Sequence, residues 1–158
     1  MVLRLLGAAI LSLCGVLFAA HLNRNAERHL REAEAWIALL RFVKAQVECF
    51  SLPMGEILCR CDADILRNCG CFASVPPKSF SAMLEVSAFC DDECEKIARA
   101  FAEEFGRGYR DEATRGCDYY LAQLEAYKNA LAKKLPAQKK MNATLSVCGA
   151  LAVVLLLL

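Results

Sequence analysis

The sequence lacks charge at both of its ends. No Asp, Glu, Lys or Arg stands between Arg4 and Arg24, and none follows Lys140. The two uncharged stretches, Leu5 to Leu22 and Met141 to Leu158, have 18 residues each. A helix of that length is about 27 Å long, close to the hydrocarbon thickness of a bilayer. We therefore expect a transmembrane helix at each end of the chain.

Each uncharged stretch has a rival interpretation. The first could be a cleaved signal peptide, but cleavage favours small residues at the last and third-last positions before the cut. Cuts after Ala20 and Ala19 place Phe18 and Leu17, respectively, at the third-last position. The second could be a buried hairpin helix of a soluble protein, although its four final leucines argue against that. We favour an uncleaved anchor for the first stretch and a membrane helix for the second.

Basic residues stand at the inner ends of both stretches. They are Arg24, Arg28, Arg31, Lys133, Lys134, Lys139 and Lys140. Basic residues near membrane ends remain cytoplasmic. We therefore predict an N-terminal transmembrane anchor over residues 1–22, a cytosolic helical-bundle domain over 23–140 and a C-terminal transmembrane helix over 141–158.

The middle of the chain lacks the signals of several function classes. Residues 21–140 hold 18 basic and 18 acidic residues, so the net charge of nucleic-acid-binding proteins is absent. No phosphate loop, nucleophile elbow or catalytic-triad signature is present. The sequence thus predicts no enzyme, no cofactor, no small-molecule substrate and no nucleic-acid partner.

The middle segment also lacks any strand pattern, and its dominant period is helical. One apolar stripe has spacings of three and four: Leu30, Ala33, Ile37, Leu40, Val43, Val47 and Phe50. No Gly or Pro separates it from the first anchor, so one unbroken helix is expected. After a turn, Pro53 is expected to begin a second helix, which carries Met54, Ile57, Leu58, Ile65 and Leu66.

Three further helices are predicted from capping residues. Ser79 would cap a short helix that bears Phe80, Met83, Leu84, Val86 and Phe89. Asp91 or Asp92 would cap the next, whose inward face would be Cys94, Ile97, Phe101 and Phe105 and whose end would be Gly106 to Gly108. The last begins near Asp111 and should kink at Pro136, with an apolar stripe of Cys117, Leu121, Leu124, Leu131 and Leu135 that Lys128 interrupts.

These elements predict an all-α fold. The two long helices would pair antiparallel between the N-terminal and C-terminal transmembrane helices, and the short helices would cap the far end of the bundle.

Cysteine, by contrast, is abundant, with ten in the chain and four in the stretch "LCRCDADILRNCGC". The zinc candidates are Cys59, Cys61, Cys69 and Cys71. The stretch "NCGC", with Gly70 between two cysteines, resembles the tight turn of a zinc-binding knuckle. On a continuous helix, however, Cys59 and Cys61 would point about 200° apart. In a cytosolic domain disulfides rarely persist. We therefore predict no metal and favour thiols that fill small apolar positions, with zinc and then redox chemistry as the alternatives.

The order and length of these parts resemble the stage III sporulation protein AB family of endospore-forming bacteria. The resemblance is carried by "LRLLGAAIL", "RHLREAEAWIALL", "SLPMGEIL" and the ending "KKMNATLSVCGALAVVLLLL", and it covers the whole chain. The chain departs from the family at Gln46, Val47 and Ser146, and neither the cysteine cluster nor "VPPKSF" is a family feature.

The resemblance implies a membrane protein of the channel complex that joins mother cell and forespore during engulfment. The family is similar to the cytosolic domain of the inner-membrane F proteins of type II secretion and type IV pilus systems. By that analogy the chain would be a platform subunit in the mother-cell membrane. Its partners would be the stage III sporulation AA-type ATPase and other subunits of the complex.

Arg107, Arg110 and Asp111 are our candidates for contact with the ATPase, at the predicted tip farthest from the membrane. An ordinary solvated turn is the simpler interpretation of these three residues. Two other functions stay open: a platform subunit of a secretion or pilus system outside sporulation, and a membrane-tethered zinc or thiol sensor.

Overall fold

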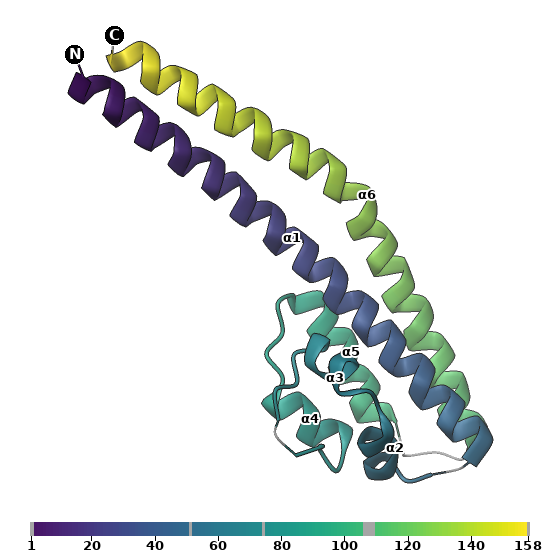
Figure 1. The fold of residues 1–158 in the computed structure, drawn as a ribbon. Coiled ribbons are helices and arrows are strands. Elements are labelled where there is room, and N and C mark those ends of the chain that lie inside the picture. The colour runs from purple at the N-terminus through teal and green to yellow at the C-terminus, as the bar shows by residue number, and fades with distance from the viewer. Residues whose placement is uncertain (1, 51, 74, 106–109, 158) are drawn as a thin grey trace. The chain divides into compact units, whose positions relative to one another are not determined.

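The computed structural model describes residues 2–50, 52–73, 75–105 and 110–157, and its regular elements are helices (Figure 1). In chain order they are α1 (Val2–Phe50), α2 (Met54–Arg60), α3 (Ala63–Asn68), α4 (Phe80–Val86), α5 (Asp92–Glu104) and α6 (Arg110–Leu157). In these ranges no strand is formed, and one isolated antiparallel bridge joins Cys71 to Ser87. The predicted all-α fold class is confirmed.

Both long helices are continuous, which the sequence predicts for the first of them. Helix α1 has 49 residues and contains no Gly or Pro after Gly15, so its backbone hydrogen bonds are not interrupted. Helix α6 has 48 residues and runs on through Pro136. Because proline has no N–H, one backbone hydrogen bond is missing at this position, yet the helix does not end there.

The chain divides into two compact units, which we call the terminal unit and the central unit. The terminal unit comprises Met1–Arg28 and Leu131–Leu158, and the central unit comprises His29–Ala130. The described part of the chain holds no helix that combines the length and the apolar character needed to cross a membrane.

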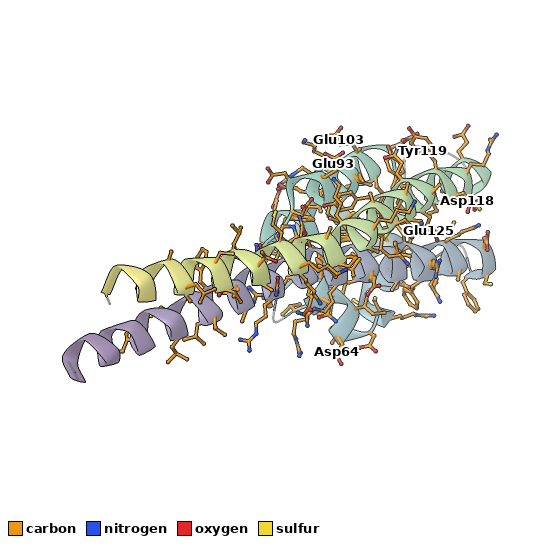
Figure 2. The ribbon with its side chains drawn as sticks, turned by 90° about the horizontal axis from the view of Figure 1, so that it is seen from above. Asp64, Glu93, Glu103, Asp118, Tyr119 and Glu125 are labelled. Carbon is orange, nitrogen blue, oxygen red and sulfur yellow. The ribbon has the colours of Figure 1, made fainter. Side chains whose placement is uncertain are left out.

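In the central unit, α1 and α6 pack antiparallel, as predicted. Lys44 Nζ lies 2.6 Å from Asp118 Oδ1, and Arg41 Nη2 lies 2.6 Å from Glu125 Oε1. Residue numbers thus fall along α1 as they rise along α6. Figure 2 labels the two carboxylates on α6.

The predicted stripe of α1 forms the centre of this unit's core. Five of its seven positions are buried, at Ala33, Ile37, Leu40, Val43 and Val47, but Phe50 at the end of the helix is 62% exposed. A second line of α1 residues is buried beside the stripe: Ala35, Trp36 and Leu39. The ring of Trp36 stacks on that of Phe89, with centroids 5.6 Å apart. The helix is therefore covered on a wider face than the stripe predicts.

The predicted second helix is in fact two. Helix α2 ends at Arg60 because Cys61 is extended, and α3 begins after Asp62, whose carboxylate accepts a hydrogen bond from the Asp64 amide at 2.9 Å. Aspartate favours such local bonds over a helix interior. The single helix expected from Met54 to Leu66 was wrong for this reason.

The predicted caps of the next two helices are confirmed. Ser79 Oγ accepts from the Ala82 amide at 3.1 Å, and Asp91 accepts from the amides of Glu93 and Cys94. Helix α4 ends at Val86, so Phe89 lies outside the helix to which we assigned it. Helix α5 ends at Glu104, ahead of the predicted stop at Gly106 to Gly108, which lies outside the described residues.

The short helices do not merely cap the far end of the pair. Figure 1 shows α2 to α5 beside α1, and Trp36 contacts rings of both Phe80 and Phe89. The core also includes Cys117, Tyr120, Leu121 and Leu124 of α6. Burying a helix that is apolar on a wide face requires partners along its length, which the short helices supply.

Candidate functional site

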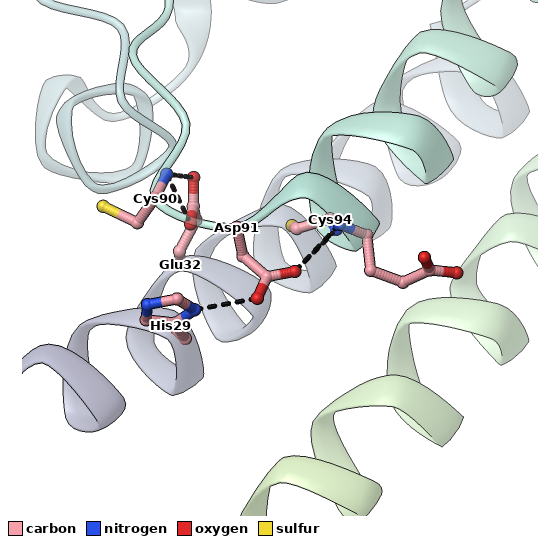
Figure 3. Close-up of polar contacts among 6 residues, drawn as sticks. His29, Glu32, Cys90, Asp91 and Cys94 are labelled. Carbon is pink, nitrogen blue, oxygen red and sulfur yellow. Dashed lines mark hydrogen bonds and ion pairs between the residues drawn. The ribbon is translucent and has the colours of Figure 1, made fainter.

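A buried carboxylate marks the place where three segments of the central unit meet (Figure 3). Glu32 of α1 is 3% exposed and is the charged residue that the described core buries. Each of its carboxylate oxygens lies 3.1 Å from the Cys90 amide, which donates to both. Burial raises the pKa of Glu32, and this amide offsets only part of the increase. Glu32 therefore fixes the loop before α5 to α1.

Asp91, the next residue of that loop, joins three helices. Its Oδ1 accepts from the Cys94 amide at 3.3 Å and so caps α5, while its Oδ2 lies 2.8 Å from Nδ1 of His29 on α1. The Tyr127 hydroxyl of α6 interacts with the same carboxylate and favours its charged form. Burial by itself would raise the pKa of Asp91, but these hydrogen bonds outweigh it and lower the pKa.

The hydrogen bonds of this network have a structural role. Its carboxylates accept hydrogen bonds from groups of the same chain, and hydrogen bonds to charged groups are among the stronger ones in proteins. Burial raises the pKa of the nearby Cys94 thiol, and the charges of Glu32 and Asp91 raise it further, so this thiol is a poor nucleophile. The arrangement holds α1, α5 and α6 together, and its buried thiol at Cys94 is not activated.

The four zinc candidates are divided between surface and core. Cys59 is exposed, whereas Cys61, Cys69 and Cys71 are buried. Because α2 ends before Cys61, Cys59 and Cys61 do not share one continuous helix, and both line one cavity of about 330 Å³ together with Cys71. Even so, the described residues contain no group of three or more His, Cys, Asp or Glu side chains placed to hold a metal ion.

Gly70 in "NCGC" is required by the backbone conformation at the end of α3. Its φ is +85°, its amide donates to the Arg67 carbonyl at 3.0 Å, and the Cys71 amide donates to the Leu66 carbonyl at 3.0 Å. This pattern is a Schellman motif, which ends α3 and favours glycine at this position. A Cβ at Gly70 would lie 2.4 Å from the Ala88 oxygen, so a side chain is excluded there.

Five of the ten cysteines fill the core, which confirms the packing interpretation for these five but not for the three exposed cysteines of the central unit. The five in the core are Cys61, Cys69, Cys71, Cys94 and Cys117. Burial raises the pKa of Cys61 and of Cys117 to about 11. The other five are exposed, and all ten are free thiols.

The predicted partner-binding residues are not placed by the structure. Arg107 lies outside the described residues, and only the backbone of Arg110 and Asp111, at the start of α6, is described. Phe105 and Ala113, on either side of them in sequence, line an apolar cavity of about 370 Å³.

Comparison of the chain with protein families, curated proteins and solved structures gives no match.

Sequence reasoning missed the network around Glu32 and Asp91. A signal for it was present, because Glu32 precedes Trp36, Leu39 and Val43 at spacings of four, three and four. An acid in line with such apolar residues is expected either to end the buried face or to have a partner inside it. The identity of that partner depends on a loop 58 residues away, which no local pattern reveals.

Proposed function

We propose that this chain is a non-enzymatic membrane platform subunit of a secretion-like complex, with its terminal unit in the bilayer and its central unit in the cytosol. By the resemblance described above, the complex is the mother cell–forespore channel required for endospore formation. The central unit would dock the stage III sporulation AA-type ATPase.

The observation that carries this proposal is the exposed apolar surface of the terminal unit. Large apolar side chains that are more than half exposed occur on both helices of the unit: Ile10, Leu13, Val16, Leu17, Phe18, Met141, Leu145, Val147 and Leu151. A water-soluble monomer rarely exposes contiguous apolar surface on this scale. The proposal rests on this exposure, not on helix length or mean hydropathy.

The distribution of these side chains favours lipid over a single protein partner. Val16, Leu17 and Phe18 are consecutive and are 60%, 60% and 64% exposed. Consecutive residues are about 100° apart around a helix, so these three point over about 200° of its circumference. One docked protein covers one face, whereas a bilayer covers every direction.

Cysteine accessibility tests the membrane part of the proposal. Cys14 and Cys148 are exposed in the terminal unit, and Cys49, Cys59 and Cys90 are exposed in the central unit. In sealed vesicles with the central unit outside, a membrane-impermeant maleimide should label only the last three. In intact cells it should label none of those three. Equal labelling of all five in vesicles would contradict the membrane assignment.

Capture of the ATPase tests the partner assignment. The full chain in detergent should retain the purified ATPase, and Arg107→Glu with Arg110→Glu should reduce retention if the predicted tip makes the contact. The matched control is Arg60→Glu with Arg67→Glu, which reverses two exposed charges of the same unit. Absence of retention in the wild type would contradict the docking role, and retention lost equally in both variants would contradict the contact at the predicted tip.

Timing of expression distinguishes sporulation from the alternative. Production confined to endospore formation would agree with the family resemblance. Production during growth, together with secretion or pilus genes, would assign the same platform role to a system outside sporulation.

A further inference from the structure

The terminal unit carries almost all of its charge as cations. Its residues include seven Lys or Arg and one acid, Glu27, which gives a formal charge of +6. The central unit has twelve basic and seventeen acidic residues, a formal charge of −5. The near-zero charge of the whole chain therefore conceals two oppositely charged parts.

Hydrogen bonds between the helices place most of these cations at one level of the terminal unit. Asn142 Nδ2 lies 2.9 Å from Asn23 Oδ1, and Lys139 Nζ lies 2.6 Å from Glu27 Oε1. At about 1.5 Å per residue, Arg24, Arg28 and Lys140 lie within about 5 Å of these contacts along the helix axes. Lys133 and Lys134 lie about 8–9 Å beyond Lys139 on α6. We call these basic residues the basic belt: Arg24, Arg28, Lys133, Lys134, Lys139 and Lys140.

The belt is accessible, and Glu27, the one acidic residue in the sequence of the terminal unit, pairs with a belt lysine. All of its side chains are exposed except that of Lys139, which is part-buried and pairs with Glu27. On the terminal side of the belt stand the exposed apolar residues, beginning with Leu22 on α1 and Met141 on α6. Cations thus border an apolar surface on both helices.

From this juxtaposition we propose that the basic belt binds the headgroups of anionic phospholipids, so that the terminal unit prefers an anionic over a neutral membrane. The inference rests on the proposed membrane location and adds the class of lipid. Nucleic acid would satisfy the cations but not the adjoining apolar side chains. An anionic bilayer satisfies both, because its phosphates lie at the edge of its hydrocarbon region.

The expected size of the preference follows from surface electrostatics. Each Lys or Arg near an anionic membrane surface favours binding by about fivefold at physiological ionic strength. Lysine and arginine stems can lie along apolar surface while their charged ends reach the phosphates. High salt shortens the screening length to about 3 Å at 1 M and should remove most of the preference.

Spin-labelled lipids measure this preference in the reconstituted full-length chain. The ratio of association constants for labelled phosphatidylglycerol and labelled phosphatidylcholine should be at least about fivefold. In the variant Lys133→Gln, Lys134→Gln, Lys140→Gln the ratio should fall at least about twofold, although Arg24 and Arg28 remain, and 1 M salt should lower the wild-type ratio toward one. The control Arg60→Gln, Lys78→Gln removes two exposed cations of the central unit and should leave the ratio unchanged.

Flotation of the same samples separates this inference from the proposed function. A chain that floats with neutral and anionic vesicles but shows a ratio near one contradicts lipid selection alone. A ratio that falls equally in the control variant also contradicts the belt. A chain that floats with neither kind of vesicle contradicts the membrane location and the lipid inference together. Flotation with a ratio that falls only in the belt variant supports both.

Discussion

The central and terminal units use the same two helices in opposite ways. In the central unit α1 buries Trp36, Leu40 and Val43 almost completely, whereas in the terminal unit it leaves Leu17 and Phe18 more than half exposed. The backbone is helical in both, so the difference lies in what covers the side chains. The central unit has α2 to α5 beside α1, and the terminal unit consists of the helix pair alone.

The comparison shows that the effect of an apolar helix face on stability depends on what covers that face. In the central unit, apolar residues stabilise the fold by leaving water. In the terminal unit the same residue types cannot do so within the unit, and we propose that an external apolar medium covers them. The four predictions below test this difference, beginning with the largest expected effect.

The largest contrast is expected between two aromatic truncations. Trp36→Ala removes a fully buried ring that contacts Phe80 and Phe89, and it should reduce the free energy of unfolding by about 3–5 kcal/mol. Phe18→Ala should change it by less than about 0.5 kcal/mol, because the ring is 64% exposed. Urea unfolding followed by circular dichroism in mild detergent measures both, and equal losses would remove the distinction between the units.

Two glycines provide the next contrast. Gly70→Ala should destabilise the chain by about 1–3 kcal/mol, because the residue has φ +85° and the new Cβ would meet the Ala88 oxygen. Gly149→Ala in the terminal unit has nothing within 4 Å of the new Cβ and should stabilise α6 by about 0.5–1 kcal/mol. Thermal unfolding of both variants is the measurement. Tolerance of alanine at position 70 would show that the turn after α3 is not as described.

Asp91 tests the network of the central unit through pH. Asp91→Ala loses the α5 cap and should cost about 0.5–2 kcal/mol, whereas Asp91→Asn keeps a capping oxygen and should cost less. Because the folded pKa of Asp91 is below its ordinary 3.8, its charge stabilises the fold above that pH, and this contribution is lost as the pH falls further.

The measured quantity is the difference in unfolding free energy between wild type and Asp91→Asn. It should be full at neutral pH and shrink below pH 3.8. Asp92→Asn, an exposed neighbour, should show little change. A wild-type advantage that grows as the pH falls below 3.8 would reverse the sign and contradict the network.

The smallest effect is expected for the surface ion pairs, one in each unit. Arg41–Glu125 in the central unit and Lys139–Glu27 in the terminal unit both have N–O distances of 2.6 Å. Double-mutant cycles should give about 0.2–1 kcal/mol for each in water. A coupling in the terminal unit that exceeds the central one only after reconstitution would indicate that lipid lowers the polarity around Lys139.

Much of the central unit follows from local sequence patterns. The spacing of apolar residues placed the buried stripe of α1, and Ser79 and Asp91 marked the starts of α4 and α5 because their side chains replace missing backbone partners. The break between α2 and α3 was not predicted, since the apolar residues on either side keep a helical period. Asp62 overrides that period with one local hydrogen bond.

The candidate site was much less predictable. Glu32 meets the Cys90 amide across 58 positions, and Tyr127 reaches Asp91 from α6. Contacts of this kind depend on how the helices pack, and the local spacing of apolar residues does not predict them. The sequence drew attention to the cysteines instead, because their spacing resembles that of metal ligands.

The sequence alone determined that the chain is helical and where most helices begin, because helix periodicity and capping involve residues three or four positions apart. It also determined which stretches are uncharged. Only the tertiary structure decided which apolar faces are covered, why Gly70 must be glycine, and how the cations of distant segments join at one level of the terminal unit. Those outcomes depend on contacts between residues far apart in the chain, which are fixed when the helices pack.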